Sequence, residues 1–150
     1  EGISFWALGE MVRRRAGLVE TGDEATTRTR LATVVALHVE DGDERDWIEQ
    51  ALLALLGFES SVGSDQLFGA WLTFFERLAA TAPVVMVFED LHFADSGLLD
   101  FVDHLLESSK KVPIYVVTLA RPELLEKSGR TGARESATSC RSTWSPYPRR

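Results

Sequence analysis

Two short apolar runs constrain the fold of this chain more than any other feature. Residues 83–88 are PVVMVF and residues 112–119 are VPIYVVTL. Each run is continuously apolar and rich in β-branched side chains, which is typical of a strand that is buried on both faces. Strands of this kind belong mostly to parallel sheets that helices cover on both sides. We therefore predict two parallel strands, each with both faces buried.

The segment between the two runs predicts a helix. Either Asp95 or Ser96 can cap its N-terminus. Apolar residues recur at helical spacing over residues 97–107: Leu98, Leu99, Phe101, Val102, Leu105 and Leu106. A strand, a helix and a second strand in this order form a βαβ unit, whose crossover is almost always right-handed.

Apolar residues at helical spacing also predict four helices before the strands. These cover residues 4–18, residues 24–39 with Asp23 as cap, a third segment that stops at Gly57, and residues 65–80. The aromatic residues of the fourth helix are expected to pack against the sheet: Phe68, Trp71, Phe74 and Phe75. The predicted fold class is α/β, with at least one βαβ unit preceded by a helical segment.

The composition is that of one soluble globular domain. The chain has 150 residues, of which 45% are hydrophobic and 26% are charged, and these values exclude a disulfide scaffold or a wholly disordered chain. No stretch reaches the ~18 consecutive apolar residues of a membrane span, so no membrane contact is expected.

Cys140 is the single cysteine, which favours a cytoplasmic location. The chain starts at Glu1 without an initiator methionine, so we expect further residues upstream.

The charge is unevenly distributed along the chain. The whole chain carries −7, but residues 130–150 contain five arginines and one acid, so residues 1–129 carry −11. An acidic body of this kind argues against a nucleic-acid interface. A run of three arginines, Arg13 to Arg15, departs from this acidic balance. Two interpretations of the run stay open: a solvated helix face, or a contact with a phosphate or a partner.

Residues suited to nucleotide chemistry follow both predicted strands. Glu89 and Asp90 come directly after the first strand, and Arg121 follows the second. Ligands of open parallel sheets bind outside the carboxyl ends of the strands, so these side chains are expected at one edge. In a nucleotide hydrolase one carboxylate holds Mg²⁺, the next orients the attacking water, and an arginine stabilises γ-phosphate charge. The alternative is structural: the acids solvate the strand end or cap the next helix, and Arg121 forms a surface ion pair.

The residues around these positions resemble a family of bacterial ATPases. The stretches VVMVFEDLHFADSGLLDFVDHLL and PIYVVTLARPELLE are similar to the Walker B and sensor-1 regions of AAA-like, STAND-type P-loop ATPase modules. The upstream EGISFWALGEMVRRRAGL is similar to the segment that follows the second strand of those modules. In this family the modules are joined to class III adenylate/guanylate cyclase domains or to LuxR-type transcriptional regulators. The resemblance covers residues 1–128.

The resemblance implies a partial P-loop NTPase domain with ATP and Mg²⁺ as ligands and an attached signalling domain as partner. Glu89 takes the metal-side position of Walker B, Asp90 the position of the catalytic acid, and Arg121 the sensor position. The phosphate-binding loop G-x-x-x-x-G-K-[ST] is absent, because the chain contains no Gly-Lys pair. In the family this loop precedes the point where the chain begins. We therefore expect that this chain alone binds ATP very weakly and does not hydrolyse it.

Two other hypotheses remain beside the ATPase. In the first, the chain is a non-catalytic α/β interaction module, in which the acids and Arg121 are structural and the amphipathic helices dock partners. In the second, Asp90, His92, Asp95 and His104 bind a metal ion, which their irregular spacing disfavours. His92 and Asp95 lie within the family signature, but no role follows from that position.

Residues 129–150 form a basic tail without hydrophobic periodicity, rich in Ser, Thr, Arg and Pro. One hypothesis is a disordered tail. The other is a shifted reading frame. The residues largely fix the first two bases of each codon. With one choice of third bases, back-translation of residues 130–150, read from the third base of the first codon, gives DWGARERNFVSLYLEPLSAT. That frame contains the strand-like NFVSLYLEPL and resembles the family's continuation after A-R-P-E-L-L.

We predict an insertion or deletion in the gene near codons 126–131. Resequencing across these codons and comparison with close relatives is expected to reveal it. An intact frame without such a change contradicts the prediction. A shifted frame means that Cys140 and Trp144 have no evolved role.

Overall fold

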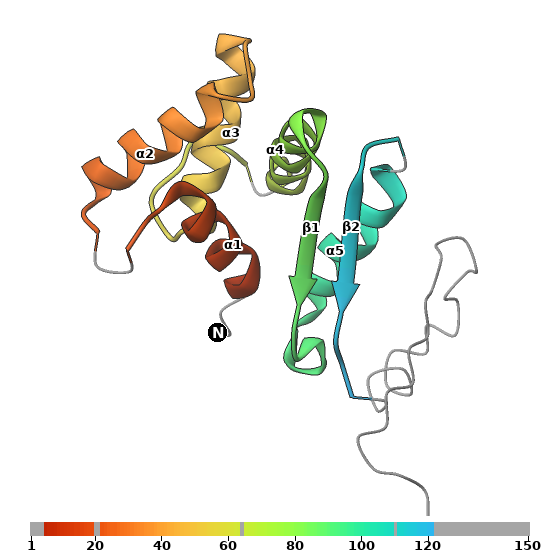
Figure 1. The fold of residues 1–150 in the computed structure, drawn as a ribbon. Helices are drawn as coiled ribbons and strands as arrows, with labels where there is room; N and C mark the ends of the chain where they lie inside the picture. The colour runs from red at the N-terminus through yellow and green to blue at the C-terminus, as the bar shows by residue number, and fades with distance from the viewer. Residues whose placement is uncertain (1–4, 20–21, 64, 110, 122–150) are drawn as a thin grey trace, which may run out of the picture.

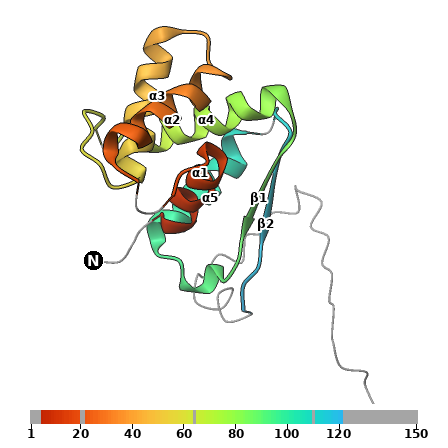
Figure 2. The ribbon, with the colours of Figure 1, turned by 60° about the vertical axis from the view of Figure 1, so that its left-hand side comes forward.

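The computed structural model describes residues 5–19, 22–63, 65–109 and 111–121. These residues form a helical layer followed by a βαβ unit, as Figures 1 and 2 show from two sides. The architecture is mixed α/β and mostly helical, as the sequence predicts at the level of fold class. The predicted tail over residues 129–150 lies outside the described residues.

All four predicted helices are present before the strands, with slightly different bounds. They are α1 (Trp6–Ala16), α2 (Glu24–Ala36), α3 (Gly42–Leu55) and α4 (Leu67–Thr81). Asp23 caps α2 by accepting a 2.8 Å hydrogen bond from the Thr26 N–H, and Asp41 caps α3 in the same way through the Glu44 N–H. Gly17 ends α1 in the left-handed conformation, with φ of 61°, which glycine adopts without a Cβ penalty.

The βαβ unit consists of β1 (Val84–Phe88), α5 (Ser96–Ser108) and β2 (Ile114–Thr118), with a short 3₁₀ helix, η1 (Leu91–Phe93), after β1. The strands are parallel, in a register that pairs Val84 with Ile114 and Phe88 with Thr118. In Figure 1 both strands point downward, β2 lies to the right of β1, and α5 lies behind them. This arrangement is the predicted right-handed crossover.

An aromatic cluster joins the helices to one another. The Phe5 ring lies 5.5 Å from the Phe68 ring and 5.0 Å from the Trp71 ring, measured between centroids. The Phe101 ring of α5 lies 5.9 Å from the Trp71 ring. The Trp71 indole N–H also donates a buried 2.8 Å hydrogen bond to the Ala51 carbonyl of α3. The cluster therefore connects the start of α1 with α3, α4 and α5.

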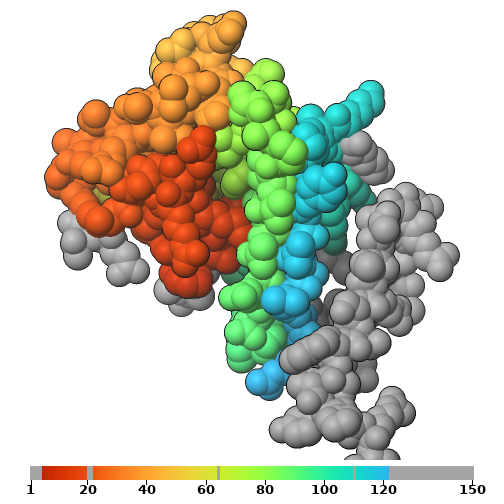
Figure 3. All heavy atoms as spheres, in the orientation of Figure 1, coloured from red at the N-terminus to blue at the C-terminus, as the bar shows by residue number. Residues whose placement is uncertain are grey.

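The strands are buried on one face only, so the predicted burial of both faces is wrong. Met86 and Phe88 point into the core, where they are 2% and 1% exposed. On the other face, Val85 and Tyr115 are each 61% exposed. Helices lie on one side of the strand pair in Figure 2, and Figure 3 shows β1 and β2 uncovered toward the viewer. The apolar runs fit a two-sided sheet, but the described residues supply cover for one side.

One edge of β1 is also open. The Val84 N–H bonds to the Pro113 carbonyl, and the Phe88 carbonyl accepts from the Leu119 N–H. Alternate residues of a parallel strand face opposite edges, so the backbone groups of Val85 and Val87 face away from β2. They have no backbone partner among the described residues.

No helix among the described residues is long and apolar enough to cross a bilayer.

We predict that Trp71→Phe lowers the free energy of unfolding by about 1–3 kcal/mol, because it removes a buried hydrogen bond and part of a packed ring. Urea denaturation followed by circular dichroism measures the loss. Trp6→Phe is the matched control, since Trp6 is 58% exposed and is expected to change stability by less than about 0.5 kcal/mol. Equal losses in the two variants contradict the proposed role of Trp71.

Candidate functional site

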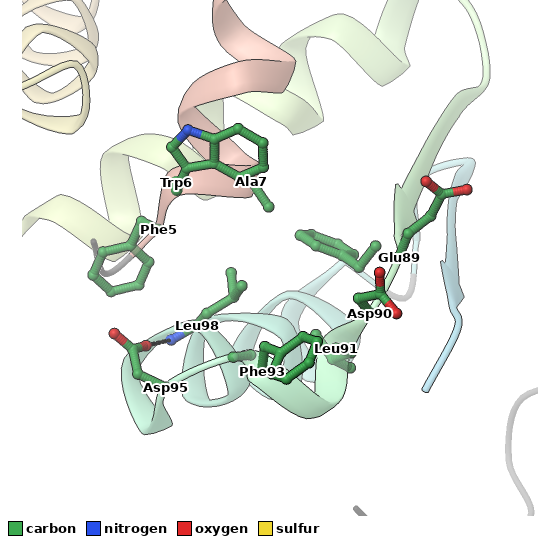
Figure 4. Close-up of a pocket in the computed structure, with 11 residues that line it drawn as sticks. Phe5, Trp6, Ala7, Glu89, Asp90, Leu91, Phe93, Asp95 and Leu98 are labelled. Atoms are coloured by element: carbon green, nitrogen blue, oxygen red, sulfur yellow. Dashed lines mark hydrogen bonds between the residues drawn. The ribbon is translucent and has the colours of Figure 1, made fainter. Parts of the chain in front are cut away.

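A pocket of about 370 Å³ lies at the carboxyl end of β1. Figure 4 shows it between the start of α1, the end of β1 and the segment that leads into α5. The lining includes both predicted acids, Glu89 and Asp90, together with Asp95 from the predicted signature. The structure therefore brings these three carboxylates to one cavity at the strand edge where ligands of parallel sheets bind.

The two predicted acids differ in backbone conformation. Glu89 directly follows the last residue of β1, and its side chain is exposed. Asp90 has φ of 52° and ψ of 36°, which is the left-handed region that residues other than glycine rarely adopt. This turn directs the chain from the strand into η1, and it leaves the Asp90 side chain 77% exposed. In Figure 4 the Glu89 and Asp90 carboxylates point in different directions at the strand side of the pocket.

Asp95 caps the N-terminus of α5, and this role explains its place in the sequence. Its Oδ1 accepts a 2.9 Å hydrogen bond from the Leu98 N–H, so Asp95 is the N-cap of α5. Of the two cap residues that the sequence allows, Asp95 is the one that the structure uses. A carboxylate at a helix N-terminus is also stabilised by the helix dipole.

His92 lies in η1, two residues after Asp90, and is mostly buried, with 11% of its side chain exposed. Its ring packs 4.1 Å from the Phe93 ring, between centroids, and its Nδ1 lies 3.9 Å from the Asp90 Oδ1. That distance is too long for a hydrogen bond, and neither ring nitrogen has a hydrogen-bond partner among the described residues. His92 thus acts as a packing residue of the turn in this structure.

Arg121 reaches the same edge of the sheet without lining the pocket. It lies two residues after Leu119, whose N–H donates to the Phe88 carbonyl at 2.9 Å and whose carbonyl accepts from the Leu91 N–H at 3.0 Å. These bonds fasten the end of β2 to the turn that carries the acids. The Arg121 side chain is exposed, and within the described part of the chain it forms no ion pair with either acid.

The apolar side of the pocket was not predicted from the sequence. Phe5, Trp6 and Phe93 line it, and Trp6 and Phe93 are largely exposed. Phe5 approaches α5 so closely that a Cβ on Gly97 would lie 3.0 Å from its Cζ. Gly97 follows the capped start of α5, and this glycine is the one signal in the sequence that could have indicated a close contact there.

Metal binding receives no support from side-chain clustering in the described ranges. No group of three or more His, Cys, Asp or Glu side chains is placed there to hold an ion. Asp90, His92, Asp95 and His104 therefore do not meet as a metal site within the described residues. A nucleotide-bound Mg²⁺ differs from such a site, because one or two carboxylates and the phosphates supply its ligands.

Comparison with protein-family models, with curated proteins and with solved structures finds no match to this chain.

We predict that the left-handed turn selects the residue at position 90. Asp90→Asn is expected to leave stability within about 0.5 kcal/mol, since Asn tolerates this conformation. Asp90→Val is expected to cost about 1–2 kcal/mol, because its branched Cβ meets the following carbonyl. Urea denaturation measures both. Glu89→Val is the control, since Glu89 does not have a positive φ; a loss in this variant equal to that of Asp90→Val contradicts the prediction.

Proposed function

We propose that this chain is the Walker B and sensor part of an ATP-binding and ATP-hydrolysing regulatory module that acts in the cytoplasm. In the intact module, ATP binding and hydrolysis change the conformation and so control an attached output, a nucleotide cyclase or a transcriptional regulator. The chain by itself does not turn over ATP, because the loop that cradles the phosphates is missing from it.

The observation that carries this proposal is the placement of Glu89 and Asp90. Both follow a parallel strand directly and line a pocket at its carboxyl end. In the proposed reaction Glu89 holds Mg²⁺, directly or through water, and Asp90 orients the water that attacks the γ-phosphate. The exposure of both carboxylates leaves them accessible to a nucleotide.

Arg121 supports the same assignment from the second strand. The hydrogen bonds of Leu119 to Phe88 and Leu91 hold the end of β2 beside the acidic turn. A guanidinium two residues further along is suited to sense or stabilise γ-phosphate charge, because it is permanently charged and binds phosphate oxygens in a fork.

A second function, a non-catalytic interaction module, is favoured by one observation. The open face of the strand pair is apolar and exposed, with Val85, Val87, Tyr115 and Val117 on its surface. Exposed apolar patches mark contact surfaces in many proteins. In this alternative the acids and Arg121 are structural, and an intact gene encodes no phosphate-binding loop.

The first test uses this chain and its gene. Titration with Mg-ATP is expected to produce no saturable rise in melting temperature at micromolar nucleotide. Sequencing upstream of the codon for Glu1 is expected to reveal G-x-x-x-x-G-K-[ST] in frame. A saturable micromolar shift contradicts the expected weak binding by the chain alone. Absence of the loop from an intact gene favours the interaction module.

The second test uses the full product of the gene. Asp90→Asn is expected to lower kcat for ATP hydrolysis by about 10²–10⁴-fold, because it removes the group that orients water, while ATP still binds. Glu89→Gln is expected to raise the Mg²⁺ concentration that activity requires. Glu107→Gln, an exposed acid on α5 outside the pocket, is the matched control. Equal activity of Asp90→Asn and the control overturns the assignment.

A further inference from the structure

A second pocket of about 270 Å³ lies at the opposite end of β1 from the acids. It is formed where the end of α1, the second residue after α2, the end of α4 and the start of β1 meet. In Figure 3 a hollow opens between the red atoms of α1 and the green atoms of β1. This pocket has no part in the proposed nucleotide chemistry.

Its polar rim is a chain of three side chains from three different segments. Arg15 Nη2 lies 2.8 Å from His38 Nε2, and His38 Nδ1 lies 3.4 Å from Thr81 Oγ1. Arginine can only donate, so Nε2 accepts and the imidazole is neutral with its proton on Nδ1. That proton faces the Thr81 hydroxyl, which donates in turn to the Leu78 carbonyl at 2.9 Å.

Arg15 contacts a histidine ring instead of an acid or a backbone carbonyl. Arg13, Arg28 and Arg77 each form an ion pair with a glutamate, and Arg30 and Arg45 donate to backbone carbonyls. Arg15 instead contacts the imidazole of His38, and no acidic residue lines the pocket. A guanidinium charge at this rim is thus left without an anion among the described residues.

His38 is held in its neutral form by this arrangement. Burial lowers its pKa below the ordinary value, and the charge of Arg15 lowers it further. Arg15 from α1 and Thr81 from α4 are the polar groups that face the ring, and the start of β1 contributes only apolar residues to the pocket. Protonation of His38 at Nε2 would place two cations side by side with no acceptor between Nε2 and the Arg15 guanidinium. An anion between them would accept from both.

The floor of the pocket is apolar. Phe75 and Met86 are buried there, 4% and 2% exposed. The other apolar lining residues are Met11, Leu78, Ala82, Pro83, Val84 and Val85. Burial of an apolar group on such a floor is favourable at about 25 cal/mol per Å². A fully hydrated phosphate gains nothing from this surface, whereas an anion with an apolar tail gains from both parts of the pocket.

We propose that this pocket binds a small carboxylate with an apolar tail. The carboxylate accepts hydrogen bonds from Arg15 and from protonated His38, and the tail lies on Phe75 and Met86. Binding therefore takes up a proton on His38 and raises its pKa. Carboxylic acids stay ionised above about pH 5.5, so affinity increases as the pH falls from 8 toward 5.5.

Sodium hexanoate is the probe, and hexanamide is its neutral counterpart. The chain is titrated with each at pH 5.5 and pH 8 while nuclear magnetic resonance follows the His38 ring and the neighbouring amides. Hexanoate is expected to bind saturably, at least about threefold more tightly at pH 5.5, and to raise the pKa of His38. A rise of one pKa unit corresponds to about tenfold in affinity.

Three variants distinguish a specific carboxylate-binding site from nonspecific attraction to positive charge. Arg15→Ala and His38→Gln are each expected to weaken hexanoate binding at least about fivefold, and His38→Gln also removes the pH dependence. Arg14→Ala is the matched control, because Arg14 is exposed on the same helix and does not line the pocket. The proposal is overturned by absence of saturation, by equal binding of hexanamide or inorganic phosphate, by pH-independent binding, or by equal losses in Arg14→Ala and Arg15→Ala.

Discussion

The position of Trp71 determines how the rest of the molecule is assembled. Its indole N–H is bonded to the Ala51 carbonyl of α3, and its ring packs against Phe5 before α1 and against Phe101 of α5. A buried indole that satisfies its N–H combines a large apolar contact with one directional bond. A two-stranded sheet has little stability of its own. The helices that gather around Trp71 therefore supply the surface on which β1 and β2 are held.

Both pockets depend on this assembly. Phe5 packs on Trp71 and lines the pocket at the acidic end of β1, so the same side chain joins the core to the candidate site. At the other end of β1, α4 contributes Phe75 to the floor of the second pocket and Thr81 to its rim. One strand thus separates an acidic, exposed site from a cationic, partly apolar one. Their opposite charges favour different ligands.

The elements of the fold were predictable because their signals are local. Asp23 and Asp95 mark helix starts, and the apolar runs before Glu89 and around Tyr115 mark the strands. The exposure of one strand face was not predictable, since an apolar run shows what can be buried and not what covers it.

Long-range contacts and backbone conformations at the two sites could not be predicted from the sequence either. The pocket contact of Phe5 with Gly97 and the contact of Arg15 with His38 join segments far apart in the chain. Asp90 adopts the left-handed conformation directly before η1, and position 90 shows only a residue type that tolerates this turn.

The open edge of β1 has a consequence for the behaviour of the chain in solution. Within the described part of the chain, the peptide groups of Val85 and Val87 have no backbone partner, and they lie beside an apolar, β-branched surface. Unpaired edges of this composition are the templates on which strands of other molecules add, and natural sheets block them with lysine, bulges or cover. Residues 84–88 contain no charged side chain. Aggregation of concentrated or partly unfolded chains is therefore expected to start at β1 and to leave the helical layer intact.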